Sequence, residues 1–179
     1  MNVVQKASAI AEAAHRDQKR KTDGSPYIAH PRAVAEILTK YGFKEEVVAA
    51  ALVHDVLEDT DFSPAELHKE LNGEVFNLVE AVTEDKSLPW EERKKKYIEA
   101  VRVAGADAKA IAAADHIHNL QSILSAYEKQ GAEVWKHFNR GKDEKIWFEE
   151  EMLKMLTESW QHPLLEEYEK LLARMKTLD

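Results

Sequence analysis

The chain has 179 residues, of which 44% are hydrophobic and 32% are charged, and its formal net charge is −8. With only 6 glycines and 5 prolines, it has about half the usual share of helix-breaking residues, which favours long helices over many short strands. The acidic balance argues against a nucleic-acid-binding protein with a broad basic surface. The lack of cysteine excludes disulfides, and no apolar run is long enough to span a bilayer. We therefore expect a cytoplasmic protein without nucleic-acid or membrane partners.

Apolar spacing and turn-forming residues divide the chain into helices joined by short connections. In the first half, helices are predicted over residues 2–17, 31–40, 44–57, 64–71 and 74–82. In the second half, they are predicted over residues 90–103, 108–127, 131–138, 142–159 and 163–177. The helix over 44–57 is nearly all apolar, which indicates a central place in the core. No strand with alternating polarity is evident, so the predicted fold is all-α, in a single compact domain spanning 1–179.

A histidine and an aspartate stand near the end of the most apolar predicted helix. His54 and Asp55 directly follow the run Ala49–Val53. An ionised carboxylate in such a run is costly to bury unless something pairs with it. A divalent metal would do so, and imidazole beside carboxylate is a common pair of ligands. Glu58 and Asp59 follow on the same helix face, where a carboxylate near a metal-bound water could act as a general acid or base.

Two further segments carry the same residue types. His30 stands in the stretch Tyr27–Pro31, and Asp115 opens the stretch Asp115–Asn119 after a run of small apolar residues. Two imidazoles and two carboxylates could thus hold one ion: His30, His54, Asp55 and Asp115. From spacing alone, a helix-capping histidine and solvated acidic helix ends explain these residues equally well.

In this order, the segments resemble the HD-domain metal-dependent phosphohydrolases. The stretches Pro26–Pro31, His54–Thr60 and Asp115–Asn119 narrow the resemblance to the hydrolase domain of RelA/SpoT-type enzymes and their small stand-alone relatives. The resemblance covers most of residues 1–125, which we expect to form the core that holds the metal site. Residues 126–179 are then expected to form a C-terminal helical extension of the same domain. The resemblance implies an HD fold that hydrolyses guanosine 3′,5′-bis(diphosphate) at the 3′-pyrophosphate, releasing pyrophosphate and GDP. Mn²⁺ is the metal that the resemblance implies.

The resemblance also implies a role for each matching residue. The implied metal ligands are His30, His54, Asp55 and Asp115. The acidic pair implied to position or activate the attacking water is Glu58 and Asp59. The implied substrate contacts are Arg20, Lys21, Asn119 and Ser122. The expected partner is a small nucleotide, and the sequence leaves the oligomeric state undetermined.

Positive charge is distributed differently from what is common in the relatives. Arg20 and Lys21 lie in a basic run that could bind phosphate, although cations at a solvated helix end give the same pattern. His116 and Gln121 stand where arginine is common in the relatives, which lowers the expected charge near the phosphates. Two alternatives therefore stay open: an HD phosphohydrolase acting on another nucleotide or phosphoester, and a non-catalytic nucleotide-binding module. The lysines at 94–96 are predicted to form a solvated helix face.

Overall fold

The computed structural model describes residues 1–179 as helices joined by turns, with one isolated β-bridge between Lys19 and Pro26. The first half contains α1 (Val3–Ala14), α2 (Ala29–Lys40), α3 (Glu45–Leu52), α4 (Val56–Asp59), α5 (Pro64–Glu70) and α6 (Gly73–Ala81). The second half contains α7 (Trp90–Val103), α8 (Ala106–Gln130), the 3-10 helix η1 (Gly131–His137), α9 (Gly141–Ser159) and α10 (Leu164–Lys176). The all-α prediction is confirmed. No helix is both long and apolar enough to cross a membrane.

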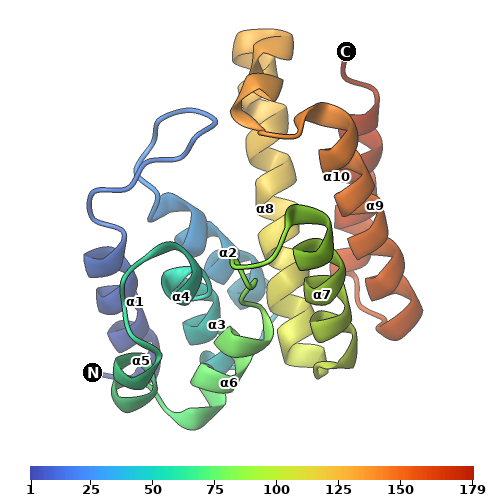
Figure 1. Ribbon diagram of the computed structural model, residues 1–179. Coiled ribbons are helices and arrows are strands. Elements are labelled where there is room, and N and C mark those ends of the chain that lie inside the picture. The colour runs from blue at the N-terminus through green and yellow to red at the C-terminus, as the bar shows by residue number, and fades with distance from the viewer.

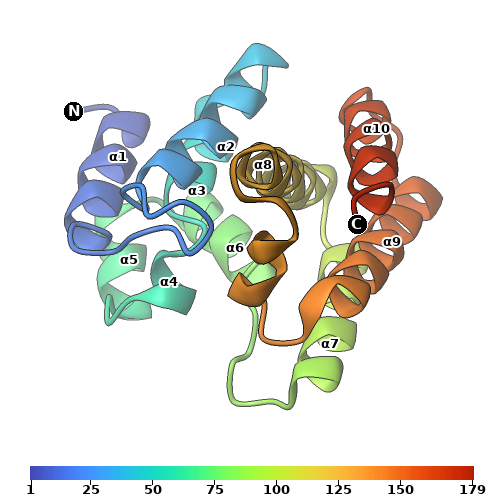
Figure 2. The same cartoon turned by 90° about the horizontal axis from the view of Figure 1, so that it is seen from above.

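The longest helix, α8, separates two groups of helices. Figure 1 shows α1 to α6 on one side of α8 and α7, α9 and α10 on the other, and Figure 2 shows the same division with α8 seen end-on. α8 contacts α2, α3 and α6 in the first group and α7, α9 and α10 in the second. Alanines at 110 and 112–114 are fully buried, and their small side chains let helices on both sides approach closely. One cluster of 40 buried hydrophobic residues extends from Ala7 to Met175.

The predicted helix over 44–57 is wrong in one respect, because the helix is interrupted after Leu52. Residues 47–52 are buried as predicted, but Val53 to Asp55 form a turn before α4 begins at Val56. In this turn the amide of Val53 bonds Ala50 O at 3.1 Å, and the amide of Val56 bonds Val53 O at 3.1 Å. These tighter bonds replace α-helical ones. Neighbours in a continuous α-helix project about 100° apart, whereas the turn brings His54 Nε2 within 3.3 Å of Asp55 Oδ2.

Replacing Ile111 with alanine tests whether α8 carries the core. Ile111 is fully buried, so Ile111→Ala is expected to lower the free energy of unfolding by about 2–5 kcal/mol, because it leaves a cavity that neighbouring residues fill only in part. The measurement is urea denaturation followed by circular dichroism. The control is Val103→Ala in α7, since Val103 is 76% exposed; its expected effect is about 0.5 kcal/mol or less. Equal losses in the two variants would contradict this picture of the core.

Candidate active site

Four side chains from three parts of the chain converge beside α8. His30 comes from the first turn of α2, His54 and Asp55 from the turn before α4, and Asp115 from the middle of α8. His30 Nε2 lies 2.9 Å from Asp115 Oδ1 and 3.6 Å from Asp55 Oδ2. His54 Nε2 lies 3.3 Å from Asp55 Oδ2 and 3.6 Å from Asp115 Oδ1. One ligand atom each from His30, His54 and Asp115 lie within 4.8 Å of one another.

The hydrogen bonding of His54 fits a cation at this cluster. Its Nδ1 lies 2.8 Å from the carbonyl oxygen of Ala51, and a carbonyl only accepts, so Nδ1 carries the proton. Nε2 is buried and has no hydrogen-bond partner. Burial lowers the pKa of His54, but the carboxylates of Asp55 and Asp115 outweigh it and raise the pKa to about 10. The carboxylates thus require positive charge between them, which a divalent ion or a protonated imidazole supplies.

The acidic pair lies next to this cluster. The carboxylate of Glu58 accepts a hydrogen bond from the amide of Glu84 at 3.1 Å. Burial, together with the carboxylates of Asp55 and Glu84, raises the pKa of Glu58 to about 7. Asp59 forms an ion pair with Lys86. A carboxyl group with a pKa near neutrality is suited to take up and release protons.

Tyr27 links the cluster to the acidic pair, a contact that the sequence interpretation missed. Its hydroxyl lies 2.6 Å from Asp55 Oδ2 and 3.0 Å from Asp59 Oδ2. Burial and these two carboxylates raise the pKa of Tyr27 far above its usual range, so the phenol stays protonated and can donate. Its place in the stretch before His30 was visible in the sequence, but its partners lie about 30 residues away and only the fold reveals them.

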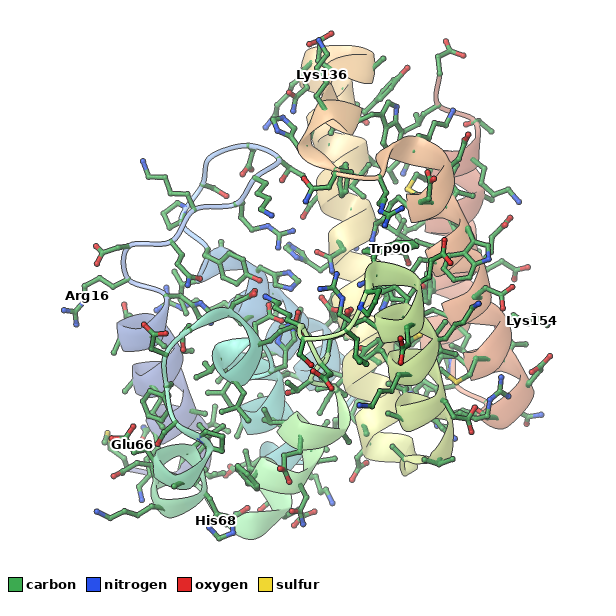
Figure 3. All side chains as sticks on the ribbon, in the orientation of Figure 1. Arg16, Glu66, His68, Trp90, Lys136 and Lys154 are labelled. Carbon is green, nitrogen blue, oxygen red and sulfur yellow. The ribbon has the colours of Figure 1, made fainter.

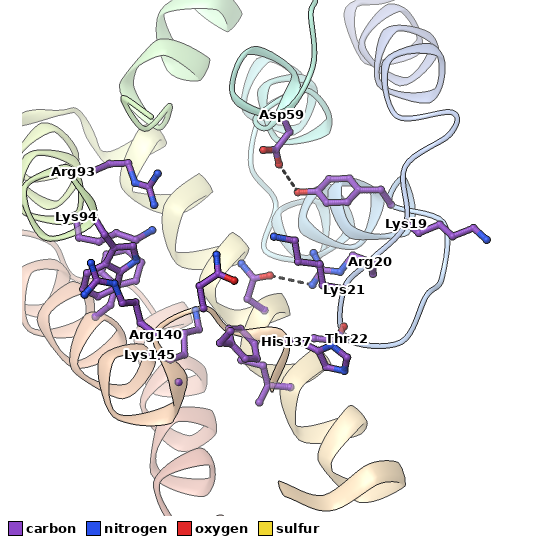
Figure 4. Close-up of a pocket in the computed structure, with 18 of the residues that line it drawn as sticks. Lys19, Arg20, Lys21, Thr22, Asp59, Arg93, Lys94, His137, Arg140 and Lys145 are labelled. Carbon is purple, nitrogen blue, oxygen red and sulfur yellow. Dashed lines mark hydrogen bonds between the residues drawn. The ribbon is translucent and has the colours of Figure 1, made fainter. Parts of the chain in front are cut away.

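A cavity of about 590 Å³ opens beside these residues. Asp59 and Tyr27 line it together with seven basic side chains: Lys19, Arg20, Lys21, Arg93, Lys94, Arg140 and Lys145. Figure 4 shows residues 19–21 on one wall, where the Lys19 side chain points away from the cavity, and the other four on the opposite wall. Asp59 is the only acidic residue in the lining, and although Glu84 and Glu149 behind it pair with Arg93, Lys94 and Lys145, cations outnumber carboxylates in the cavity.

Three of the four implied substrate contacts, Arg20, Lys21 and Asn119, line the cavity, and Ser122 contacts Arg20 from outside the lining. An Arg20 Nη2 group donates to Asn119 Oδ1 at 3.1 Å and to Ser122 Oγ at 3.3 Å. The Asn119 amide in turn donates to Asp115 Oδ1 at 2.7 Å. Lys21 lines the cavity next to Arg20. The basic run is therefore connected to the metal-ligand candidates through one amide side chain; Figure 4 marks the hydrogen bond that Arg20 makes.

The opposite wall consists of residues that the sequence interpretation did not assign to the site. The prediction of a solvated face at 94–96 is wrong for Lys94, whose side chain is only 14% exposed and bonds Glu84 Oε1 at 2.5 Å. Its ammonium lies 4.2 Å from the centre of the Phe148 ring. Arg140 comes from the turn before α9 and Lys145 from α9 itself. No local pattern marks these residues, because only the packing of α7 against α9 brings them to one wall.

His116 and Gln121, which replace arginines common in the relatives, do not line the cavity. His116 Nδ1 lies 2.7 Å from Glu149 Oε2 in a fully buried pair. The Gln121 amide donates to Glu167 Oε1 at 3.2 Å. Both side chains connect α8 to the last two helices. On the opposite wall, Arg93 and Lys94 both pair with Glu84 and Lys145 pairs with Glu149, so Arg140 is the cation there that no carboxylate neutralises by direct contact.

Comparison with known proteins supports a single family. A family model described as "HD domain" matches residues 7–143. The guanosine-3′,5′-bis(diphosphate) 3′-pyrophosphohydrolases MESH1 of Mus musculus and Homo sapiens are each 42% identical over 120 residues, which cover 65% of this chain and 67% of theirs. The guanosine-3′,5′-bis(diphosphate) 3′-pyrophosphohydrolase of Aquifex aeolicus is 33% identical over 136 residues. The match covers 74% of this chain and 19% of the Aquifex protein.

Two solved structures share the fold along most of their length. The Listeria monocytogenes protein lmo0812 has a TM-score of 0.77 at 38% identity, covering 82% of this chain and 97% of that one. A metazoan ortholog of SpoT, described as hydrolysing ppGpp, has a TM-score of 0.83 at 28% identity, covering 99% of this chain and 98% of that one. The resemblance predicted from the motifs is confirmed.

The two carboxylates of the His/Asp cluster are stabilised by positive charge between them. We therefore expect a divalent ion to stabilise the folded chain. At about one hundred times its dissociation constant, Mn²⁺ should raise the free energy of unfolding by about 2.7 kcal/mol. Asp115→Asn keeps the shape and removes the charge, so it should abolish this increment. The measurement is unfolding with and without the ion for each variant, so that any effect of the substitution itself cancels. Asp107→Asn, in the first turn of the same helix, is the control and should retain the increment. An increment that survives in Asp115→Asn would contradict this assignment.

Proposed function

Since this chain belongs to the HD-domain family, we propose that it is a metal-dependent phosphohydrolase that removes the 3′-pyrophosphate of guanosine 3′,5′-bis(diphosphate). The observation that carries the proposal is the placement of a His/Asp cluster and an acidic pair at the edge of a strongly basic cavity. In the reaction, a water oxygen bonds to the phosphorus on the ribose 3′ oxygen. The bond between that phosphorus and the 3′ oxygen breaks, and the oxygen takes up a proton. The products are pyrophosphate and GDP.

The residues that would hold the ion are His30, His54, Asp55 and Asp115. Two imidazole nitrogens with two carboxylates suit manganese, iron or zinc better than calcium, and we propose Mn²⁺. When bound, such an ion acidifies a water and neutralises charge on the leaving pyrophosphate. The unpartnered Nε2 of His54, aimed at two carboxylates, supports this ligand set.

The acidic pair would handle the attacking water and its proton. Asp59 lines the cavity and shares the Tyr27 hydroxyl with Asp55, so its carboxylate is held at the boundary between the cluster and the cavity. Glu58, with its pKa near 7, would accept the proton at neutral pH. Tyr27 would orient the two aspartates through its single O–H, which is shared between Asp55 Oδ2 at 2.6 Å and Asp59 Oδ2 at 3.0 Å and stays on the phenol.

The two basic walls match a substrate with two diphosphate groups. Arginine binds phosphate through two parallel hydrogen bonds, and lysine adds a mobile positive charge. The cavity volume of about 590 Å³ lies within the range of small-molecule sites. Because the rest of the chain is acidic, the concentrated positive potential favours entry of an anion at this place.

The alternatives left open by the sequence have less support. A different phosphoester substrate was suggested by the missing arginines at 116 and 121, but Arg140, which has no carboxylate partner, adds positive charge from another direction. A non-catalytic nucleotide-binding module would have no use for Glu58 and Asp59 beside the metal-ligand candidates.

Replacing Asp59 with asparagine tests the role of the acidic pair. Asp59→Asn should lower kcat by about 10²–10⁴-fold, the usual contribution of a general acid or base, while pyrophosphate remains the product. The measurement is pyrophosphate release from guanosine 3′,5′-bis(diphosphate) with Mn²⁺. Asp61→Asn, two residues further on and exposed, is the control. Release of monophosphate by the unaltered protein, or full activity of Asp59→Asn, would contradict the assignment.

Replacing Arg140 with alanine tests the second wall. Arg140 is exposed and its recorded contact is with the face of Trp90, so its removal should not affect folding. Loss of a hydrogen bond to a charged group costs about 1.5–3 kcal/mol, and we expect KM to rise by about 10-fold or more. Steady-state kinetics measure this change. Arg174→Ala on α10, outside the cavity lining, should leave KM unchanged; an unchanged KM in Arg140→Ala would remove this wall from the substrate site.

A further inference from the structure

A contact between two histidines lies directly behind the metal-ligand candidates. His30 Nδ1, on α2, lies 2.7 Å from His118 Nδ1, on α8. The ring centroids are 4.9 Å apart and the planes are inclined at 33°. At this separation one nitrogen carries a proton and the other offers a lone pair. The contact therefore links the protonation pattern of one ring to that of the other.

The other nitrogen of His30 decides which ring donates: without an ion it can donate to the Asp115 carboxylate, whereas with an ion bound it must be bare. His30 Nε2 lies 2.9 Å from Asp115 Oδ1 and 3.6 Å from Asp55 Oδ2, inside the candidate cluster. A neutral imidazole carries one proton, so Nε2 can bind an ion only when the proton is on Nδ1. His118 Nδ1 must then accept that proton's hydrogen bond, and the proton of the His118 ring must sit on Nε2. The reverse arrangement would put a proton on His30 Nε2 and block the ligand position.

From this geometry we propose that His118 is a positioning residue that holds His30 in the tautomer whose Nε2 can bind the metal. The inference rests on the metal centre of the proposed function and extends it to a residue outside the ligand set. His54 is held in the same tautomer by the carbonyl of Ala51. The two imidazole ligands are thus fixed by different acceptors, one from the main chain and one from a side chain.

The position of His118 on α8 explains how it reaches His30. Asp115, His118, Asn119 and Ser122 follow the spacing that places residues on one face of a helix. Ser122 Oγ donates to the carbonyl oxygen of His118 at 2.9 Å, and Arg20 contacts both Asn119 and Ser122. One face of α8 therefore presents a ligand candidate, the acceptor for a second ligand candidate, and two of the implied substrate contacts.

Two substitutions separate hydrogen bonding from packing. His118→Phe fills the space without an acceptor, whereas the side-chain oxygen of His118→Asn can take the place of Nδ1. The matched control is His68→Phe on α5, where the side chain is exposed and lies far from the site (Figure 3). The first measurement is the Mn²⁺ dissociation constant without substrate, from the electron paramagnetic resonance signal of the free ion.

His118→Phe should weaken Mn²⁺ binding by about 10–100-fold, which is the usual effect of removing the hydrogen-bond partner of a metal-bound histidine. His118→Asn keeps an acceptor, so its Mn²⁺ dissociation constant should stay within about threefold of that of the unaltered protein. His68→Phe should bind as the unaltered protein does. If His118→Phe folds and binds Mn²⁺ normally, His118 only packs, and the proposal is overturned while the metal centre stands. If the unaltered protein binds no Mn²⁺, the metal centre itself fails, and this role fails with it.

A second measurement needs no variant. Two-bond nitrogen–proton correlation spectra of the protein loaded with diamagnetic Zn²⁺ identify the tautomer of each histidine when the ligand position is occupied. We expect His30 to carry its proton on Nδ1 and His118 on Nε2. A His30 ring with its proton on Nε2 and a bare Nδ1 would overturn the proposal even if His118→Phe fails to fold.

Discussion

The site depends on the electrostatic requirement of two carboxylates, Asp55 and Asp115, held in contact with two buried imidazoles. Two carboxylates this close to one another repel unless positive charge lies between them, which a divalent ion or a protonated imidazole supplies. The hydrogen bond from His54 Nδ1 to a carbonyl oxygen leaves its second nitrogen directed toward that charge. The turn after Leu52 contributes to this arrangement, because it places the side chains of His54 and Asp55 next to each other.

Helix α8 connects this cluster to both halves of the chain. Its small buried alanines allow close packing of helices on two sides, and its polar face carries Asp115 together with the residues that contact Arg20. On its other side, His116 joins a buried network with Glu149, Lys145 and Tyr168. Because Lys145 also lines the cavity, the last helices contribute to the site as well as to the core.

The distribution of charge is compatible with the proposed polyphosphate substrate even though the chain as a whole is acidic. The excess of acidic residues lies outside the cavity, whose lining has seven basic residues and one acidic residue. The acidic residue, Asp59, lies at the boundary with the metal-ligand candidates, where the proposed reaction places the attacking water. Attraction of the substrate and chemistry on it are thus assigned to separate but adjoining surfaces.

The sequence by itself determined the helical fold class, the family and the four residues of the His/Asp cluster, because each depends on local periodicity or on short motifs. It did not determine the interruption after Leu52. The continuous apolar run predicts one helix, and the turn is explained only by the contacts that His54 and Asp55 make with other helices. The role of Tyr27, the burial of His116 and the second basic wall were also decided only by tertiary structure. Lys94 and Arg140 belong to ordinary helix surfaces and turns in the sequence. They become part of a cavity only because α7 and α9 pack side by side across from the loop that carries Arg20.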